Sequence, residues 1–446
     1  MRSLPLTVFE EYLFHENQAH YPCNICIRTR FSGKLQRDQL AQAVAKVAPL
    51  HPHLTATVER GLWGRLRWKF NSSAEIPIHW LENQTDSFRP DFGSFDPEKE
   101  TAFHLYVVYE PNKWDLYVNQ SHSLCDGAGY FRFLHDLMIA YDQRCGNDRA
   151  QLPITDLPRL KRRGSQRFRL GSFLSIIPIK VAGFLIALSL FRRQVSPLLP
   201  SRDTLATSPY PKSSPHLVSR YLGKETYFHF RKSAREMGIS INDLFLAAFH
   251  AAIGSWRASL GEGEPADWIR LSVPVNLRLK ADNSLPACNA ISIISIDRQA
   301  KGLSNRSRLL RRAKEDMQYV KKGRLGTIYL SILWIRRFLP GGIRSFSHRD
   351  ICRTSATLTN LGHQFPHSPL KNSNGRLETG GSTLERITSA APYRRHAQAT
   401  LLMAVYAGEL EATLNYDPRA ICKEEAENLI DSFVSELRIM TQIEDT

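Results

Sequence analysis

Ser121-His122-Ser123-Leu124-Cys125-Asp126-Gly127-Ala128-Gly129 is the stretch of the chain that decides its fold. Two runs of aromatic and β-branched residues precede it, Leu105 to Tyr109 and Trp114 to Gln120, and the turn-forming residues between them indicate a hairpin. After it, apolar side chains recur at helical spacing from Tyr130 to Tyr141, which predicts an amphipathic helix. We therefore expect His122 at the end of a strand, where the glycines open a turn into a helix.

This placement gives His122 a chemical interpretation as well as a structural one. A rigid strand end next to a glycine turn can hold an imidazole at the edge of a cavity. The imidazole has an ordinary pKa of about 6.5, so it can accept a proton from a hydroxyl or an amine at neutral pH. Asp126 is then either a second catalytic group or an ion-pair partner that fixes the turn. Taken alone, the same residues also fit a core histidine beside an ordinary Asp-Gly turn.

The composition describes a globular protein with sizeable cores. The chain has 446 residues, of which 42% are hydrophobic and 23% are charged, enough for roughly two or three layered units. Its seven cysteines are scattered and odd in number, which indicates a reducing compartment. Met1 to Phe14 has no apolar core and contains Glu10 and Glu11, so we expect no secretory signal and a cytoplasmic location.

Several classes of function are not indicated by the sequence. The chain lacks a Walker-type phosphate loop, an HExxH zinc motif and a GxSxG serine elbow. Cys23 and Cys26 form a lone CxxC without the second pair that a zinc site needs, and we interpret them as buried thiols. We expect no bound metal, and the nucleotide-hydrolysing and serine-hydrolase classes lose support.

The hydrophobic periodicity predicts a mixed α/β protein in two comparable halves. Residues 194–216 contain five prolines among serines and indicate a surface crossover between the halves. We therefore divide the chain into an N-terminal subdomain, residues 1–160, a basic and apolar crossover, residues 161–216, and a C-terminal subdomain, residues 217–446. The expected elements besides the hairpin are strands at 25–29, 54–58, 269–275, 290–296 and 410–416, and helices at 38–47, 240–256, 304–322 and 426–440.

Four further segments follow the order of a known family. They are Gly33 to Leu54, which ends in a His-Pro-x-Leu sequence, Ser240 to Phe245, Val273-Pro274-Val275-Asn276-Leu277-Arg278, and Thr359-Asn360-Leu361-Gly362. Together with the hexad from His122 to Gly127, they make the chain resemble the CoA-dependent acyltransferases that share an HxxxDG motif. This superfamily includes alcohol acetyltransferases, wax ester synthases, BAHD acyltransferases and the condensation domains of peptide synthetases.

The resemblance implies a fold and a site. The fold is two chloramphenicol-acetyltransferase-like α/β subdomains arranged in a V, with a tunnel between them and the motif histidine midway. His122 would be the general base that deprotonates the acceptor hydroxyl or amine, which then attacks an acyl thioester. The motif aspartate of the family points away from the tunnel and pairs with an arginine. Asp126 and Arg278 match these positions, and we interpret Asp126 as structural, because a buried carboxylate needs a counter-charge.

Other positions are less determined. Many members have a second histidine directly before the motif, where this chain has Ser121. The tetrahedral intermediate needs an oxyanion donor. The Gly127 backbone N–H and a hydroxyl of Ser355 or Thr359 are candidates, and Asn360 is a candidate tunnel residue. The resemblance implies no bound cofactor, because acyl-CoA or a carrier-bound acyl thioester is the co-substrate.

Two segments carry the basic charge of the chain, which is +16 overall. Residues 157–202 contain ten Lys and Arg residues and no acid, and residues 301–349 contain thirteen against two acids. Leu170 to Phe191 is 22 residues long and mostly apolar, so by length it could span a bilayer. Since the motif histidine precedes it and the arginine partner follows it, a span would separate two residues that the fold brings together. We expect no crossing.

Two interpretations remain for this segment. It is a loop-covered helix with solvated arginines, or a membrane-surface element in which each Lys or Arg near anionic lipid contributes about 1 kcal/mol. Thr327 to Ile343 has the same basic and apolar character, and we favour peripheral membrane contact. The same positive field can attract the phosphates of CoA or an acidic acyl carrier protein. Nucleic acid is not an expected partner, because no recognition motif accompanies the mixed charges and aromatics between Arg65 and Lys69.

The sequence therefore supports three hypotheses. The first is an acyltransferase that moves an acyl group from a thioester, acyl-CoA foremost, to an alcohol or, less favoured, an amine, acting as a monomer with His122 as the base. The second is a catalytically silent, condensation-like scaffold that binds lipid or a carrier protein. The third is a basic membrane- or nucleic-acid-binding protein whose hexad is coincidental.

Overall fold

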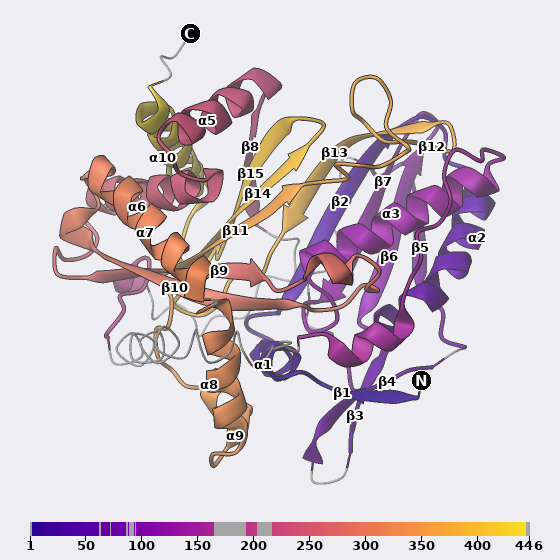
Figure 1. Cartoon of the computed structure of the whole chain (residues 1–446), viewed down its shortest axis with the longest axis horizontal. Helices are drawn as coiled ribbons and strands as arrows, with labels where there is room; N and C mark the ends of the chain where they lie inside the picture. The colour runs from indigo at the N-terminus through magenta and orange to yellow at the C-terminus, as the bar shows by residue number, and fades with distance from the viewer. Residues whose placement is uncertain are drawn as a thin grey trace.

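The computed structural model describes residues 2–61, 64–71, 73–85, 88, 93, 95–164, 193–202, 216–323 and 325–442. Within these residues the chain forms two six-stranded sheets and one three-stranded sheet. Figure 1 shows the two larger sheets side by side, each with helices packed on one face. The apolar segment Leu170 to Phe191 lies outside the described residues, and so does most of the crossover that we placed at 161–216.

The first large sheet has the strand order β12-β13-β2-β7-β6-β5. Its strands and the helices that cover it are β2 (Asn24–Ser32), β5 (Ile78–Glu82), β6 (Phe103–Glu110), β7 (Lys113–Ser121), β12 (Glu378–Thr379), β13 (Ser382–Ala390), α2 (Arg37–Val47) and α3 (Gly127–Arg144). β6 and β7 form the expected antiparallel hairpin, with Glu110 opposite Lys113. In the core beneath α3, the rings of Phe31 and Trp114 stack with their centroids 3.9 Å apart.

The second large sheet has the order β10-β9-β11-β14-β15-β8. Its members are β8 (Leu217–Leu222), β9 (Trp268–Asn276), β10 (Ile291–Gln299), β11 (Ala356–His363), β14 (Ala399–Tyr406) and β15 (Glu409–Tyr416), with helices α5 (Lys224–Glu236), α6 (Ile241–Ser259), α7 (Arg306–Gly323) and α10 (Lys423–Thr441). The expected capping box is present at the start of α6, where Ser240 and Asp243 bond each other's backbone amides. β9 and β10 reach from this sheet toward α3 (Figure 1).

Smaller elements complete the fold. They are α1 (Val8–Glu16), α8 (Ile328–Arg337), α9 (Gly342–Ser347), the sheet of β1 (Ser3–Pro5), β4 (Leu66–Lys69) and β3 (Thr57–Arg60), and the 3-10 turns η1 (Ala48–Leu50), η2 (Pro52–Thr55), η4 (Leu157–Arg162), η6 (Lys280–Asp282), η7 (Ala300–Gly302) and η8 (Leu325–Thr327). The strand expected from residue 54 is wrong at its start. Pro52 opens a 3-10 turn that continues through Thr55, and the strand begins only at Thr57.

One exchange between the halves is not indicated by the sequence pattern. β12 and β13 follow the second half in the chain, yet β13 pairs antiparallel with β2 of the first sheet. The indole N–H of Trp114 donates to the hydroxyl of Ser382 at 3.1 Å, which fixes the start of β13 against β7. Residues 378–390 therefore belong to the first sheet, although we had placed them in the C-terminal subdomain.

The described helices are short or polar relative to the apolar core of a bilayer. None of them alone is long and apolar enough to cross a membrane. Only α5 and α6 taken together reach that length and composition, and the chain bends by 101° between them.

The buried histidine of α6 makes the stability of the fold depend on pH. His250 is 1% exposed, and its Nδ1 lies 2.9 Å from the Leu246 carbonyl oxygen. Burial, reinforced by the Arg298 charge, lowers the pKa of His250 to about 3. In the unfolded chain the group has its ordinary pKa of about 6.5, so below that pH the unfolded state binds the proton first.

We therefore expect the free energy of unfolding to fall as the pH drops from 6.5 toward 3. At pH 5 the contribution of this histidine amounts to roughly 2 kcal/mol. Urea titrations of the wild type and of His250→Gln at pH 7.5 and pH 5.0 measure it. The variant should lose less stability than the wild type between the two pH values, and an equal loss in both would contradict the assignment.

Candidate active site

The backbone holds His122 at the expected junction of strand and helix. β7 ends at Ser121, a turn follows, and Asp126 is the N-cap of α3. The His122 amide donates to the Cys23 carbonyl oxygen at 2.8 Å, and its own carbonyl accepts from the Asn289 side-chain amide at 2.7 Å. Ser121, which directly precedes His122, is buried, and its hydroxyl lies 2.9 Å from that of Ser123.

The imidazole of His122 is arranged to keep one nitrogen free of a proton. Nδ1 lies 3.4 Å from the Cys125 carbonyl oxygen. Since a carbonyl oxygen only accepts, this contact favours the tautomer with the proton on Nδ1 and the lone pair on Nε2. Burial lowers the pKa of His122 to about 4, opposed by the charge of Asp126 and aided by that of Arg394. The ring is therefore neutral at pH 7, and the residue keeps partial solvent exposure.

Asp126 is a buried carboxylate with a full set of donors. One oxygen accepts from the Gly129 amide at 2.8 Å, which caps α3. The other accepts from Arg278 Nη1 at 2.8 Å and from the Ala290 amide at 2.7 Å. The carboxylate is 1% exposed and faces these partners, so none of its contacts involves the His122 ring.

Arg278 comes from the other half of the molecule, just beyond the end of β9. Its Nη1 bonds Asp126, and its Nη2 donates to the Cys288 carbonyl oxygen at 2.8 Å. The Asn276 side-chain oxygen accepts from the Arg278 amide at 3.0 Å. Burial lowers the pKa of Arg278, but the charge and hydrogen bond of Asp126 together with the nearby Cys288 and Cys125 outweigh it, and the net shift is upward. Arg278 therefore keeps its positive charge, and its pair with Asp126 joins the two halves at the motif.

The connection between β9 and β10, residues 277–290, is fixed to the first half at further points. Asn289 donates to the carbonyl oxygens of both His122 and Ser123, each at 2.7 Å. The Ala287 amide donates to Nδ1 of His51 at 3.1 Å, and Nε2 of His51 lies 3.2 Å from Asp136. A segment of the second half therefore sets the backbone on both sides of the motif turn.

Other chain segments pass close to both glycines of the motif, and at Gly129 the nearest atoms include backbone that a side chain would have to displace. A Cβ added to Gly129 would lie 2.8 Å from the Cys288 carbonyl oxygen and 2.5 Å from the Cys125 sulfur. A Cβ on Gly127 would lie 2.6 Å from a methyl group of Leu361. Leu361 belongs to the Thr359-Asn360-Leu361-Gly362 segment. The structure therefore places this segment against the start of α3.

The remaining candidate residues have different positions. The Asn360 side-chain amide donates to Asn242 Oδ1 at 2.5 Å, and its oxygen accepts from the Gly362 amide at 2.8 Å. Thr359 precedes it in β11 and is partly exposed. Ser355 lies at the other end of β9 from Arg278. Its hydroxyl donates to the Ser196 carbonyl at 2.6 Å and accepts from the Arg270 amide at 3.0 Å, so it has no donor left for an oxyanion.

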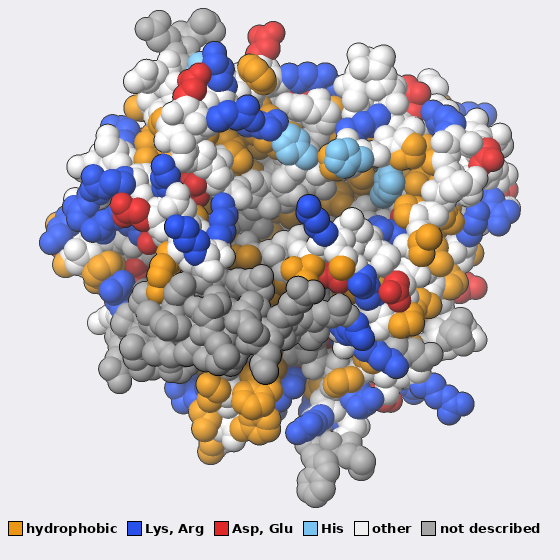
Figure 2. Space-filling model, viewed as in Figure 1, with side chains coloured by type: hydrophobic (Ala, Val, Ile, Leu, Met, Phe, Trp, Pro, Cys, Tyr) orange, Lys and Arg blue, Asp and Glu red, His pale blue; other side chains and the backbone are white. Residues whose placement is uncertain are grey.

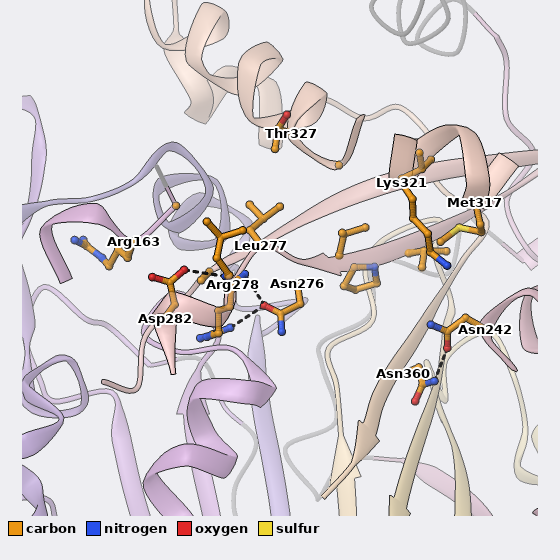
Figure 3. Close-up of a pocket in the computed structure, with 18 of the residues that line it drawn as sticks. Arg163, Asn242, Asn276, Leu277, Arg278, Asp282, Met317, Lys321, Thr327 and Asn360 are labelled. Atoms are coloured by element: carbon orange, nitrogen blue, oxygen red, sulfur yellow. Dashed lines mark hydrogen bonds between the residues drawn. The ribbon is translucent and has the colours of Figure 1, made fainter. Parts of the chain in front are cut away.

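A cavity of about 510 Å³ adjoins this network on the side of the second half (Figure 3). Asn276, Arg278 and Asn360 line it. In Figure 3, the side chains of Asn242 and Asn360 point toward each other in one wall and are joined by a hydrogen bond. The remaining wall combines apolar side chains with cations and one carboxylate, and Arg163 among the cations is buried and paired with Glu10. These side chains are Phe245, Leu246, Val273, Leu277, Leu358, Met317 and Met403, then Arg159, Arg162, Arg163 and Lys321, and Asp282. His122 is not among the described residues that line the cavity.

Metal ligands are not gathered anywhere in the part of the chain that the structure describes. No group of three or more His, Cys, Asp or Glu side chains is placed to hold an ion there. Cys23 and Cys26 are free and buried, as the interpretation of the lone CxxC predicts.

Solved structures of several condensation domains have this fold. The first condensation domain of the calcium-dependent antibiotic synthetase, in complex with a substrate analogue, has a TM-score of 0.71 at 12% identity over 99% of this chain and 98% of that chain. The starter condensation domain of rhizomide synthetase, a mutant in complex with C8-CoA, has 0.69 at 15% identity over 99% and 95%. The condensation domain of the Monacolin K polyketide synthase has 0.66 at 13% identity over 99% and 98%.

These likenesses establish the fold class, which is the mixed α/β, two-subdomain fold of condensation domains. The expected two-subdomain architecture is therefore confirmed. No family model matches the sequence, and no curated protein matches it.

Several residues of the site were not predicted. Asn289, Ala290 and His51 act through their contacts with the motif turn and its supporting segment, and residues of these types carry no spacing signal of their own. His51 lies in the His-Pro-x-Leu segment, which the resemblance singles out without stating what its histidine does. Arg394, whose charge lowers the pKa of His122, follows β13 and reaches the site only because that strand joins the first sheet.

The ion pair of Asp126 and Arg278 makes a stability prediction. Asp126→Ala leaves the buried guanidinium without its counter-charge, so we expect it to lower the free energy of unfolding by about 3–5 kcal/mol. Arg278→Met should also destabilise, and the double variant should lose less than the sum of the two single losses. Urea unfolding of the four proteins measures the coupling.

Asp431→Ala is the matched control, because Asp431 pairs with Arg220 at the surface at 2.6 Å. An exposed pair of this kind contributes about 0–1 kcal/mol. If Asp126→Ala costs no more than Asp431→Ala, the motif aspartate does not hold the halves together.

Proposed function

We propose that this protein is an acyltransferase that moves an acyl group from a thioester to a hydroxyl acceptor, with His122 as the general base. The observation that carries the proposal is the contact of His122 Nδ1 with the Cys125 carbonyl oxygen at 3.4 Å, which favours a proton on Nδ1 and leaves the lone pair on Nε2. Asp126, engaged by three donors, acts as a brace rather than as a second base.

The reaction can be written so that protons and electrons balance. The acceptor O–H gives its proton to His122 Nε2 while the oxygen attacks the thioester carbonyl carbon. The C–S bond then breaks, and the departing sulfur takes the proton back from the imidazolium. An ester and a free thiol result, and neither a covalent acyl-enzyme nor a bound cofactor is required. The Gly127 N–H is the proposed oxyanion donor, because the first amides of a helix have no acceptor within it.

The apolar cavity supports an acyl chain as the transferred group. Its walls are largely apolar, and exposed cations among the lining residues, such as Arg162 and Lys321, suit the phosphates of a donor such as acyl-CoA. The rhizomide synthetase domain was solved with C8-CoA, which supports the same choice of donor here. A carrier-bound acyl thioester carries a phosphate as well and is the other donor of this class.

A hydroxyl acceptor suits the base better than an amine does. A neutral amine already has a free lone pair, whereas an alcohol gains nucleophilicity only as its proton is removed. His122 supplies that removal at neutral pH.

We further propose that the protein acts in the cytoplasm as a monomer, with a lipid-like acceptor. A cytoplasmic location is supported by the described cysteines, which are all free thiols, as a reducing compartment requires.

One observation favours a second function. The cavity of about 510 Å³ has no wall formed by His122. A scaffold that binds lipid or a carrier protein without turning it over would have this arrangement. The alternative function is therefore a catalytically silent, condensation-like binding protein, and turnover separates the two.

Turnover is tested with a panel of acyl-CoAs of increasing chain length and a primary alcohol, following free thiol and ester. The wild type should form both in equal amounts. His122→Ala should lower turnover by roughly 10²–10⁴-fold, the contribution of a positioned general base. His20→Ala, which removes an exposed imidazole, is the matched control and should keep wild-type turnover.

Circular dichroism and thermal melting of both variants show whether the fold is intact. Unchanged turnover in a folded His122→Ala protein would remove the assignment of the base. Tight acyl-CoA binding without thiol release from any donor, carrier-bound thioesters included, would favour the silent scaffold instead.

A further inference from the structure

Helices α8 and α9 form a projection from the second half that exposes large apolar side chains. Trp334 is 58% exposed and Phe338 is 61% exposed, and their rings lie 4.9 Å apart. Ile335, Leu339 and Ile351 are exposed beside them. Figure 2 shows an apolar patch at the lower edge of the molecule, where Figure 1 places α8 and α9.

The packing of α8 does not account for this exposure. Its inner side already packs on α1 through Leu333, which is fully buried, and through Tyr329 and Leu330. The outer side of α8 is therefore apolar as well as the inner side, which packs on α1. Scattered exposed apolar residues are ordinary, but a contiguous patch marks a surface that contacts another phase or molecule.

Behind the patch lies an arginine-rich cavity of about 330 Å³. Its apolar wall includes Ile335 and Ile351 of the patch. Among the described residues that line it there is no carboxylate, and these arginines are present: Arg193, Arg270, Arg336, Arg349 and Arg353. We call this the arginine pocket.

The acids nearest to the arginine pocket are engaged elsewhere or shared. Asp350 accepts from Arg395 at 3.0 Å and lies 2.9 Å from the ring nitrogen of His396. Asp297 is shared by Arg193 and Arg270, at 3.0 Å and 2.7 Å. The carboxylates therefore balance only part of the positive charge around the pocket.

Arg336 shows the consequence of this imbalance. Its Nε is buried and has no hydrogen-bond partner. Burial and the charges of Arg349 and Arg353 lower the pKa of Arg336, because like charges disfavour its protonated form. Arg353 is held on the far side, stacked on Phe346 at 3.7 Å and donating to the carbonyl of that residue at 2.6 Å. An anion in the pocket would both accept from Arg336 and reduce the repulsion.

We propose that the α8–α9 projection docks on an anionic phospholipid membrane, with the aromatic patch in the interface and one lipid phosphate in the arginine pocket. An aromatic and aliphatic tip flanked by arginines matches the chemistry of a membrane surface, which is apolar inside and negative at the headgroups. An arginine fork binds a phosphate with two parallel hydrogen bonds. The inference does not rest on acyl transfer, because docking needs no turnover.

Vesicle flotation of the full chain tests the proposal. The protein should float with vesicles that contain phosphatidylcholine and phosphatidic acid and should float much less with phosphatidylcholine alone. Arg336→Gln/Arg349→Gln should weaken binding to the acidic vesicles by roughly 25-fold, which is about fivefold for each arginine. Trp334→Ser/Phe338→Ser should weaken it as well, although all arginines remain.

The matched control separates a built surface from the general positive charge of the chain. Arg308→Gln/Arg312→Gln removes two charges from exposed arginines of α7 in another cleft and should change binding less than twofold. An equal loss in the control and in the Arg336/Arg349 variant would show unspecific attraction and overturn the proposal. Flotation that is no stronger with acidic than with neutral vesicles would overturn it too, and would leave an acidic carrier protein as the occupant of the surface.

Discussion

The structure depends above all on the carboxylate of Asp126. Its oxygens accept from the Gly129 amide of its own helix and from Arg278 and Ala290 of the other half. A buried charge is tolerated only where it is paired and hydrogen-bonded, so these donors have to be in place whenever the protein is folded. The contacts that satisfy the charge thereby fix the start of α3 and the connection between β9 and β10 in one arrangement.

That arrangement also sets the tautomer and the pKa of His122. The connection carries Asn289, which holds the His122 carbonyl, while the Cys125 carbonyl selects the proton position on the ring. Burial then lowers the pKa of His122 to about 4. His122 is therefore a neutral base without a carboxylate hydrogen-bonded to its ring. A catalytic pair of His122 and Asp126 would have required such a hydrogen bond. The structure thus separates the two conspicuous residues of the motif: Asp126 holds the turn, and His122 is left for the proposed proton transfer.

The described arginines differ in how their charge is balanced. Arg28 and Arg30 share the carboxylate of Asp115, and Arg278 pairs with Asp126. In the arginine pocket, Arg193 and Arg270 share Asp297, whereas Arg336 faces the charges of Arg349 and Arg353 and has a buried Nε without a hydrogen-bond partner. An ion pair stabilises the fold, whereas the like charges around Arg336 repel one another. This contrast is the reason for assigning Arg336 and its neighbours to an external anion.

The sequence predicted local structure around the motif better than long-range contacts. Hairpin, turn and helix follow from alternating and helical periodicities between residues 105 and 141, and these are local properties. The pairing of Asp126 with Arg278 came from the resemblance, because nothing within either segment specifies the other. The exchange of β13 into the first sheet and the hydroxyl bonds of Ser355 depend on packing between distant segments. The hydrophobic periodicity of the sequence indicates neither the pairing of β13 nor the hydrogen bonds of Ser355.

The pH dependence of kcat/KM tests the central claim, that His122 acts as a neutral base of low pKa. Enzyme kept at pH 7.5 and diluted briefly into each assay buffer, with an acyl-CoA and an alcohol as substrates, avoids slow acid unfolding. Because the base must be unprotonated, activity should be constant from pH 8 to pH 6 and then fall by one proton with an apparent pKa of about 4. A fall centred at pH 6.5 or above would contradict the account, since it would describe an imidazole that the fold does not perturb.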